Sequence, residues 1–374
     1  MPDKIKICYI LSHLPQGGAE RQTLNLIKGL DFERYDITLI LYASTEIFYK
    51  EVMALPIRLI INPASDSNKL MRNLKHAISL RKSLRRQDYD LLHTMLFHNG
   101  FWVRLLAPGR YNGRILYSIR NTIDDSPLHE KLVEKLVAFR SVVVTNSFKV
   151  LNQYIDLVGE KRRPRVHNIY NGIDVQRFEY NSLPETGDRI VIGTVGRQTA
   201  LKNQIQILKA IREVCKTEPV HLYIIGDKSK ESYIENERFV YENQLRGTVE
   251  ILDSQANIGV YYRRFNIFVL SSVNESCPNS LLEAMLSRSL CIVSAGSNPD
   301  HYISDGINGF VYDGSLEMLT DKLYQAISLV RSGGHHEIVN NGCEYVKTNF
   351  SYVSMVNAYD GLYNDMLDDK HSGQ

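Results

Sequence analysis

The amino-acid sequence predicts an α/β protein made of two doubly wound domains, each a parallel sheet with helices on both faces. The chain has 374 residues, which is longer than one typical domain of about 100 to 200 residues. Short β-branched runs alternate with amphipathic helical stretches along most of it. A polar segment at 171–188, broken by glycine and proline, reads as a linker between two such series. These features predict one domain over 1–175 and a second over 176–351.

Each predicted strand is a short apolar run that is bounded by polar or turn residues. In the first domain the strands are expected at 5–11, 37–42, 57–61, 91–93, 115–119, 142–145 and 166–169, with helices near 19–30, 68–86, 127–139 and 147–158. In the second domain the strands are expected at 190–195, 221–225, 249–252, 267–270, 291–294 and 310–312, with helices between them.

Composition excludes several classes of protein. The net charge is only +2, so no global field favours nucleic acid as a partner. The five cysteines form no CxxC pair and lie mostly in apolar segments, which is typical of reduced core thiols. No run of about 18 apolar residues is present, and the N-terminal apolar run is too short for a signal sequence. We therefore expect a cytoplasmic protein that at most lies on a membrane.

Two basic residues follow the first strand of the second domain, in the sequence GRQTALKN. Arg197 and Lys202 fall on the predicted strand-to-helix loop, close to a helix that should begin at Asn203. Ligand sites of doubly wound sheets lie outside the carboxyl ends of the strands, where this loop is expected. Two cations beside the N–H groups of a helix N-terminus suit a diphosphate. Two solvated loop charges are the alternative.

The sequence ESCPNSLLEA carries two carboxylates, Glu275 and Glu283, after another predicted strand. Pro278 stops any helix before it, so Glu275 is expected in a loop, with Asn279 and Ser280 at the start of a helix. A carboxylate can accept hydrogen bonds from two neighbouring sugar or ribose hydroxyls, which gives both glutamates a ligand-binding role. A capping box between Ser280 and Glu283 explains the same pattern without a ligand. Both explanations remain open.

Glycines and histidines after strands of the first domain add further candidates. Gly17 and Gly18, in QGGAER, would let the backbone approach a ligand closely at the start of a helix. No GxGxxG motif is present, which counts against a dinucleotide cofactor. In DLLHTMLFHNG, His93 ends a strand and His98 begins the next helix, so His98 is better placed to face a ligand. A core or capping histidine is the alternative at both positions.

Two charged features concern metals and membranes. Asp88 and Asp90 form an Asp-x-Asp, but they precede a strand, at the end of the sheet opposite to the expected site, so no obligatory metal is expected. The helix at 68–86 carries a basic set, Lys75, Arg81, Lys82, Arg85 and Arg86, and an apolar set, Leu74, Ile78, Leu80 and Leu84. The apolar set should dock on the core. The basic side at 75–87 is then either a contact for an anionic membrane surface or a solvated face.

Taken together, these residues resemble the retaining GT-B glycosyltransferases of family four, which include many bacterial capsule and lipopolysaccharide sugar transferases. The matching motifs are GGAE at 17–20, NGID at 171–174, the arginine and lysine at 197 and 202, IIGD at 224–227, the glutamates at 275 and 283, EAM at 283–285 and DGINGF at 305–310. The resemblance covers nearly the whole chain. It implies the GT-B fold, in which two Rossmann-like doubly wound domains face each other across a cleft.

The resemblance also implies roles for individual residues. Arg197 and Lys202 would hold the donor diphosphate in place of a metal, and Glu283 would hold the ribose hydroxyls. Glu275 and His98 would contact the donor sugar. The groups that would approach the phosphates and the sugar through their backbone are Asn279, Ser280, Leu281, Gly17 and Gly18. The chain departs from the family at 288, where arginine replaces the glycine that usually follows EAM.

The implied function is retaining, metal-independent transfer of a sugar from a nucleotide diphosphate-sugar, with UDP favoured over GDP, to a glycan or lipid-linked acceptor in surface polysaccharide synthesis. The resemblance further implies that the N-terminal domain binds the acceptor and that the C-terminal domain binds the donor. It implies no cofactor. A C-terminal crossover helix at 352–374 would return to the first domain. Its apolar residues Val353, Val356, Tyr359, Tyr363 and Leu367 recur at helical spacing and should form the docked face.

Two other functions fit the same architecture. A nucleotide-sugar 2-epimerase would convert its substrate without any acceptor. A catalytically silent partner would bind a nucleotide or a glycan and support another transferase. The four charged candidates, Arg197, Lys202, Glu275 and Glu283, argue against a silent protein, because such a copy would be free to lose them.

Overall fold

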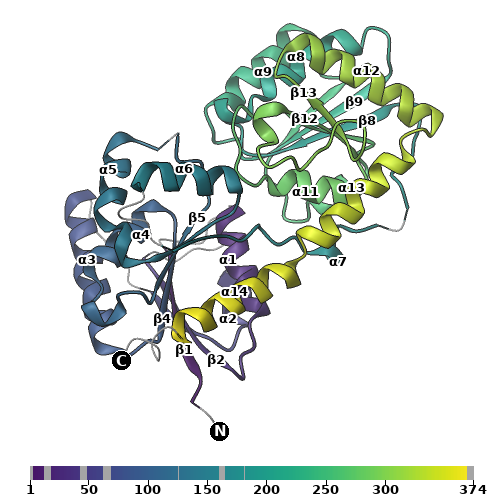
Figure 1. The fold of residues 1–374 in the computed structure, drawn as a ribbon. Helices are drawn as coiled ribbons and strands as arrows, with labels where there is room; N and C mark the ends of the chain where they lie inside the picture. The colour runs from purple at the N-terminus through teal and green to yellow at the C-terminus, as the bar shows by residue number, and fades with distance from the viewer. Residues whose placement is uncertain are drawn as a thin grey trace. The chain divides into compact units, whose positions relative to one another are not determined.

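The computed structural model describes residues 3–11, 18–42, 49–61, 69–124, 126–159, 165–180 and 182–368. Contacts between Cα atoms divide the chain into two compact units (Figure 1). The first unit is Met1–Gly172 together with Tyr352–Gln374, and the second is Ile173–Ser351. The division falls just before the expected boundary at 175. None of the described helices combines the length and the apolar character that crossing a bilayer requires.

The first unit is a seven-stranded parallel sheet in the order β3-β2-β1-β4-β5-β6-β7. The strands are β1 (Ile5–Leu11), β2 (Tyr35–Leu41), β3 (Arg58–Ile61), β4 (Leu91–Met95), β5 (Ile115–Ile119), β6 (Val142–Thr145) and β7 (Val166–Asn168). The helices are α1 (Gly18–Gly29), α2 (Tyr49–Met53), α3 (Lys69–Arg86), α4 (Phe97–Leu106), α5 (Leu128–Val137), α6 (Phe148–Val158) and α14 (Tyr352–Asp368), with short 3-10 turns η1 (Gly109–Tyr111) and η2 (Ala138–Arg140).

Both faces of this sheet are buried, as the nearly continuous apolar strands require. Along β1, Ile7 and Tyr9 point to the core beneath α1 and α14, whereas Cys8 and Ile10 point to the core beneath α3 and α4. This alternation follows from the two-residue period of a strand. Helices therefore cover both faces, which makes the unit doubly wound.

The second unit is a six-stranded parallel sheet in the order β10-β9-β8-β11-β12-β13. The strands are β8 (Ile190–Val195), β9 (Val220–Ile225), β10 (Val249–Leu252), β11 (Ile267–Leu270), β12 (Leu290–Ser294) and β13 (Phe310–Tyr312). The helices are α7 (Val175–Phe178), α8 (Gln204–Val214), α9 (Ser232–Glu242), α10 (Gly259–Tyr262), α11 (Asn279–Leu286), α12 (Leu316–Ser332) and α13 (His336–Asn349), with 3-10 turns η4 (Ala200–Lys202) and η5 (Ala295–Ser297).

The predicted fold class is confirmed, and every predicted strand is present with bounds within two residues of those expected. The short helix α2 was not predicted. The cysteines are free thiols, and Cys215 is partly exposed while the other four are buried. The strands were predicted correctly because each strand of a fully buried parallel sheet is a short apolar run.

The segment 171–188, which its polar composition predicted as a linker, packs in large part within the second unit. It contains α7, and Phe178 is only 4% exposed in the second unit. Ser287 donates a hydrogen bond to the Phe178 carbonyl at 3.0 Å, and Tyr180 donates one to the Gly259 carbonyl at 2.9 Å. A few aromatic residues in a polar segment were enough to pack it against the core.

Two amphipathic helices bury a different set of residues from the one expected. On α3, Leu80 and Leu84 are fully buried, but Ile78 is 60% exposed and Leu74 is also exposed. On α14, Val353 is exposed, whereas Val356, Tyr359 and Tyr363 are buried as expected and Leu367 is partly buried. The remaining contacts of α14 come from Met355, Leu362 and Met366. Helical spacing alone therefore identified amphipathic helices but not the edges of their buried stripes.

Arg288 has a left-handed backbone conformation, with φ of 57°. It follows α11 at the place where the family resemblance leads one to expect glycine, which adopts positive φ without strain. The guanidinium group offers compensating contacts, because Nε donates to Asn340 Oδ1 at 3.2 Å and Nη1 donates to the Tyr180 carbonyl. The arginine thus holds the end of α11 against the segment that follows α7.

Candidate functional site

Three loops meet at the carboxyl ends of β8, β11 and β12 in the second unit. Backbone hydrogen bonds join them, from Val273 N–H to the Leu201 carbonyl at 2.9 Å and from Glu275 N–H to the Gly296 carbonyl at 3.1 Å. Because the strands are parallel and adjacent, their carboxyl ends lie at one edge of the sheet. This edge holds the candidate residues that the sequence placed after β8 and β11.

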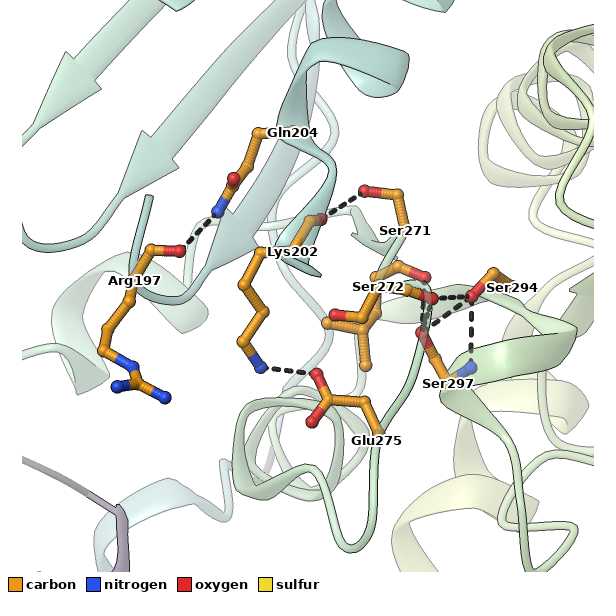
Figure 2. A network of polar contacts seen from close by, with 9 residues as sticks. Arg197, Lys202, Gln204, Ser271, Ser272, Glu275, Ser294 and Ser297 are labelled. Carbon is orange, nitrogen blue, oxygen red and sulfur yellow. Dashed lines mark hydrogen bonds and ion pairs between the residues drawn. The ribbon is translucent and has the colours of Figure 1, made fainter. Parts of the chain in front are cut away.

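Lys202 and Glu275 form an ion pair across two of these loops (Figure 2). Lys202 Nζ donates to Glu275 Oε1, and the two side chains are only 17% and 12% exposed. Opposite charges that are withdrawn from water interact more strongly than surface pairs. The structure therefore brings together two residues that the sequence had placed in separate motifs, and it opposes the view of Lys202 as a solvated loop charge.

Arg197 lies on the same loop as Lys202 but is exposed. In Figure 2 both long side chains extend to the same side of the loop. Gln204 stabilises this loop, since its Nε2 donates a hydrogen bond to the Arg197 carbonyl at 3.1 Å. The helix α8 begins at Gln204 rather than at Asn203, which instead has a left-handed conformation with φ of 50° after the turn η4. Asparagine tolerates that conformation better than most residues.

Buried serines fix the positions of these loops, and the sequence reasoning missed them. Ser271 Oγ donates to the Lys202 carbonyl at 2.9 Å and contacts the Asn203 carbonyl at 3.0 Å. Ser294 Oγ and Ser297 Oγ lie 2.7 Å apart, and each contacts the Ser272 carbonyl (Figure 2). A sequence feature that could have identified them is the presence of small polar residues at the ends of the apolar runs of β11 and β12. At such positions a hydroxyl can donate a hydrogen bond to a loop carbonyl.

Two glycines let these loops approach each other. A Cβ atom on Gly226, the glycine of IIGD, would lie 1.8 Å from the Gly196 carbonyl oxygen. A Cβ atom on Gly296 would lie 2.0 Å from the Val273 carbonyl oxygen. Both contacts are with backbone, which cannot move aside as a flexible side chain could. The close approach of the loops after β8, β9, β11 and β12 therefore depends on these two positions.

The helix α11 carries the second glutamate of the E-x7-E motif. The helix begins at Asn279, and Pro278 is its N-cap without a side-chain hydrogen bond. Ser280 lies inside the first turn, so the capping-box alternative is wrong, because proline at the N-cap has no side chain that could accept a hydrogen bond. Leu281 is fully buried, which leaves only its backbone available to a ligand.

Glu283 lies beside the buried side chain of Tyr262. Burial raises the pKa of Tyr262 well above its usual range, and the charge and hydrogen bonding of Glu283 raise it further. The Tyr262 hydroxyl oxygen lies 3.2 Å from the Ser280 carbonyl oxygen, so its single proton can be donated to Ser280 or to Glu283. Tyr262 therefore remains a neutral donor that orients the first turn of α11. The carboxylate of Glu283 is partly buried.

The candidate site residues of the first unit differ in how deeply they are buried. Gly17 lies outside the described residues, and Gly18 is the first residue of α1. His98 is exposed on the first turn of α4, where Trp102 Nε1 donates to its Nε2 at 3.4 Å. His93 is instead a core residue, whose ring nitrogens lie 2.7 Å from the Tyr363 hydroxyl and 2.9 Å from Ser118 Oγ. Burial and then the Arg120 charge lower the pKa of His93 well below its usual range.

A pocket lies at the carboxyl ends of β4 and β5. Its lining includes Leu96, Phe97, Arg120, Glu130 and Lys131. Leu96 has φ of 64° and ψ of 154°, a conformation that is strained for any residue with a Cβ atom. Such strain gathers at functional sites, so the pocket is a second candidate, next to the turn of α4 that carries His98. No sequence motif predicted this pocket.

The described residues contain no group of three or more histidine, cysteine, aspartate or glutamate side chains that could hold a metal ion. Asp88 and Asp90 lie at the amino end of β4. Asp90 Oδ2 accepts a hydrogen bond from the Lys6 backbone at 2.9 Å, and Asp88 lies 3.6 Å from Arg110. Both aspartates thus have partners within the first unit.

The sequence matches two families of known proteins along consecutive halves. Residues 16–177 match Glycosyltransferase Family 4, and residues 175–342 match Glycosyl transferases group 1. In an alignment of 402 positions, gaps included, the chain is 23% identical to the UDP-Gal:alpha-D-GlcNAc-diphosphoundecaprenol alpha-1,3-galactosyltransferase of Escherichia coli, covering 98% of this chain and 98% of the relative.

Solved structures show the same fold. A glycosyltransferase from Rickettsia africae ESF-5 superposes with a TM-score of 0.83 at 20% identity, covering 98% of this chain and 99% of that one. Anabaena Alr3699/HepE, solved in complex with UDP and glucose, superposes with a TM-score of 0.77 at 17% identity, covering 96% of this chain and 100% of that one. With both halves matched in order and the GT-B architecture present, this chain belongs to the glycosyltransferases of group 1 and family 4.

Proposed function

We propose that this glycosyltransferase moves a sugar from a UDP-sugar to a glycan or lipid-linked acceptor in surface polysaccharide synthesis, with retention of configuration and without an obligatory metal. The observation that carries the proposal is the arrangement of Arg197, Lys202 and Glu275 at the carboxyl end of the second sheet. Two cations and a carboxylate at one edge supply charge for a diphosphate and an acceptor of hydrogen bonds for a sugar.

The leaving group is a nucleoside diphosphate, which gains negative charge as the bond to the sugar breaks. Arg197 is exposed and can reach an incoming diphosphate without losing another partner that the structure describes. Lys202 is already paired with Glu275, so a bound diphosphate would compete for its amine. Fixed positive groups stabilise developing charge without reorganisation, which is the task that a metal performs in other transferases.

Release of Lys202 by the diphosphate would leave the Glu275 carboxylate beside the donor sugar, where it can accept sugar hydroxyls. Glu283, one helical turn into α11, is proposed to bind the ribose. The first N–H groups of α11 are proposed to approach the phosphates or the sugar, because Pro278 cannot cap them. His98 is exposed on the other unit and is proposed as a further contact to the donor sugar.

UDP is the favoured nucleotide. A relative over nearly the whole chain is named for UDP-Gal, and a protein of the same fold was solved with UDP and glucose. The same relative acts on a diphosphoundecaprenol-linked sugar, which favours a lipid-linked acceptor here. The pocket beside Leu96 and Phe97 is proposed to receive the acceptor sugar, because it combines an apolar wall with Arg120 and Glu130.

A lipid-linked acceptor implies work at the inner face of the cytoplasmic membrane. On α3 the described basic residues Lys75, Arg81, Lys82, Arg85 and Arg86 are exposed. Anionic lipids attract such a set by about 1 kcal/mol for each charge near the surface. We therefore propose that the basic side of α3 contacts an anionic membrane surface. No nucleic acid partner is proposed.

The first experiment is a thermal-shift series with UDP, GDP and ADP, each with and without EDTA. A ligand that binds only the native state raises the melting temperature by mass action. Stabilisation by UDP that persists in EDTA supports the proposal. Stabilisation that EDTA abolishes contradicts the metal-independent part, and preference for GDP or ADP contradicts the donor assignment.

Product analysis then separates the alternatives. A transferase releases UDP and extends an acceptor only when an acceptor is present. A 2-epimerase would convert the nucleotide sugar in the absence of an acceptor, and a silent partner would bind without any product. Conversion of UDP-sugar alone to an isomer would therefore overturn the proposal.

A further inference from the structure

The pocket of the first unit contains a buried tyrosine, Tyr117, that the proposed function does not use. Tyr117 is the third residue of β5, it is 3% exposed and it lines the pocket. Its ring packs against α4, since a Cβ atom on Gly100 would lie only 2.4 Å from ring carbon Cε2. The guanidinium group of Arg104 lies over the same ring, 4.0 Å from its centre. These contacts fix the position of the tyrosine in the pocket.

The hydroxyl group of Tyr117 makes no hydrogen bond with any residue that the structure describes. Burial, and next the charge of Glu134, raise the pKa of Tyr117 well above its usual range, so the hydroxyl keeps its proton. A buried polar group without a partner destabilises the fold, and almost all such groups in proteins are bonded. At the wall of a pocket, this exception is a donor that is available to a ligand.

The buried groups next to Tyr117 are bonded within the fold. The Glu134 carboxylate accepts hydrogen bonds from Arg104 Nη1 at 2.8 Å and from Arg104 Nη2 at 2.5 Å. The same carboxylate accepts a hydrogen bond from the Tyr154 hydroxyl at 3.2 Å. Glu134, Arg104 and Tyr154 therefore stabilise one another, which leaves the Tyr117 hydroxyl as the donor for a ligand.

Two cations that line the pocket are held by other groups. Arg120 Nη1 donates to Asn171 Oδ1 at 2.5 Å, and Arg120 Nη2 donates to the Tyr359 hydroxyl at 2.6 Å. Lys131 Nζ donates to a backbone carbonyl at 2.9 Å. Because side chains alternate along a strand and Tyr359 belongs to the core beneath α14, the Arg120 guanidinium lies on the opposite side of the sheet from Tyr117.

Glu130 supplies a hydrogen-bond acceptor in the same pocket. It lies one turn before Glu134 on α5 and is partly buried. Its carboxylate forms no hydrogen bond or ion pair with any residue in the described part of the chain. The charge of Glu130 also raises the pKa of Tyr117, which places the two groups in the same part of the pocket. A ligand there meets a hydroxyl donor and a carboxylate acceptor.

The remaining wall of the pocket is largely apolar, and its apolar residues are Leu96, Phe97, Ile119, Ile123 and Leu157. A matching ligand group must accept a hydrogen bond, donate one and present an apolar part. An acetamido group does all three, through its carbonyl oxygen, its N–H and its methyl group. A sugar hydroxyl lacks the apolar part. A carboxylate or a phosphate would place a negative charge beside Glu130.

We propose that Tyr117 and Glu130 recognise the acetamido group of an N-acetylated amino sugar at the end of the acceptor. The carbonyl oxygen accepts from the Tyr117 hydroxyl, the N–H donates to the Glu130 carboxylate, and the methyl group packs against the apolar wall. The inference deepens the proposed function and rests on it for the role of this pocket as the acceptor site. Tyr117 is thus a residue that determines specificity and takes no part in the bond change.

The test is saturation-transfer NMR of the full chain with four methyl glycosides, those of N-acetylglucosamine, N-acetylgalactosamine, glucose and galactose. At least one N-acetylated glycoside should bind, and its acetamido methyl protons should receive the strongest saturation. The matching hydroxyl sugar should bind about tenfold more weakly, as expected for one lost hydrogen bond and one lost buried methyl group. A wild-type chain without this preference, including one that binds none of the four, would overturn the inference.

Tyr117→Phe removes only the hydroxyl group. The affinity for the N-acetylated glycoside should fall about fivefold, as expected for one neutral hydrogen bond. The melting temperature should stay equal or rise, because the lost hydroxyl had no described partner in the fold. A tyrosine with a merely structural role would instead lose stability and keep the affinity. Equal affinity of Tyr117→Phe and wild type would overturn the inference.

Two further variants sharpen the comparison. Glu130→Gln keeps the size of the side chain but weakens its acceptor, so it should lower the affinity for the N-acetylated glycoside by several-fold. Tyr89→Phe is the matched control, because Tyr89 is a buried tyrosine of the same unit, 4% exposed, that does not line this pocket. Its affinity for the glycosides should equal that of the wild type, and a loss like that of Tyr117→Phe would contradict a specific role of Tyr117.

The shift of the melting temperature with UDP is measured in the same preparations. A missing UDP shift would contradict the proposed donor site, whereas the NMR result would still report on the acetamido site. A product assay with a UDP-sugar then tests the acceptor role. Transfer to an N-acetylated glycoside that falls in Tyr117→Phe supports the inference, and transfer only to the hydroxyl sugars would overturn it.

Discussion

Lys202 and Glu275 form a nearly buried ion pair although they are 73 residues apart in the sequence. Each residue lies on a loop after a strand, and β8 and β11 are neighbours in the sheet. Backbone hydrogen bonds between the loops and the carbonyl contacts of Ser271 hold the lysine in place. The ion pair is therefore already formed at the place where a diphosphate is proposed to bind.

Arg197→Ala should weaken UDP binding by about 1 to 3 kcal/mol, as expected for the loss of a charge-assisted hydrogen bond. The fold should remain intact, because the arginine side chain is exposed. Isothermal titration with UDP measures the affinity, and the melting temperature without ligand reports on the fold. Lys216→Ala, which removes an exposed lysine of the same unit, is the control. Equal affinity of wild type and Arg197→Ala would contradict the role of Arg197.

Glu275→Gln should separate binding from transfer. The change removes a negative charge beside the proposed diphosphate and frees the Lys202 amine, so the affinity for UDP should stay equal or rise. The transfer rate should fall, because an amide accepts sugar hydroxyls less strongly than a carboxylate. Titration with UDP and a product assay with a UDP-sugar and an acceptor measure the two effects. A parallel loss of affinity and rate would indicate instead that Glu275 acts mainly by positioning Lys202.

His93 should make the first unit less stable in mild acid. Its pKa is lowered in the folded state, so the unfolded chain binds a proton first as the pH falls below about 6.5. The free energy of unfolding therefore falls with decreasing pH, by at most about 1.4 kcal/mol per pH unit from this residue.

Urea unfolding between pH 7.5 and pH 5 measures this slope. His93→Gln should reduce it, since glutamine does not titrate and can still reach Tyr363 or Ser118. His129→Gln, the same substitution at an exposed position, is the matched control. An unchanged slope in His93→Gln would show that other groups dominate the acid sensitivity.

Arg104 and Glu134 should be strongly coupled in stability. Arg104 is fully buried, its guanidinium lies 4.0 Å from the Tyr117 ring centre, and Glu134 is its charged partner. Glu134→Ala leaves a buried charge without a counter-ion and should cost about 3 to 5 kcal/mol. Replacement of both residues, Arg104→Met with Glu134→Leu, should cost less than Glu134→Ala alone. A double-mutant cycle in urea measures the coupling, and additive costs would contradict it.

Arg288→Gly and Arg288→Ala should differ in stability although both lose the same side-chain contacts. Alanine keeps the left-handed strain at φ of 57°, whereas glycine relieves it. Arg288→Ala should therefore be less stable than Arg288→Gly by about 1 kcal/mol, within the usual cost of that conformation. Thermal unfolding of the two variants and the wild type measures the difference. Equal stability of the two variants would mean that the local backbone relaxes to negative φ in Arg288→Ala.

The sequence by itself determined the strands, their grouping into two sheets and the loops that carry the candidate residues. Buried parallel strands need apolar runs such as Ile5–Leu11, and those runs are local features of the chain. The rule that ligands bind at the carboxyl ends of strands then directed attention to Arg197, Lys202 and Glu275. Local patterning was sufficient because each of these features depends on residues close together in the sequence.

Only the tertiary structure decided which residues meet and which faces are buried. Helical periodicity could not show that Leu80 is buried while Ile78 on the same helix is exposed, since that depends on the neighbouring elements. Likewise, no local signal pairs Lys202 with Glu275 or turns Glu134 inward to Arg104. Side-chain pairing and burial result from contacts between distant segments, and the free energy of those contacts is set by the packed fold rather than by local sequence.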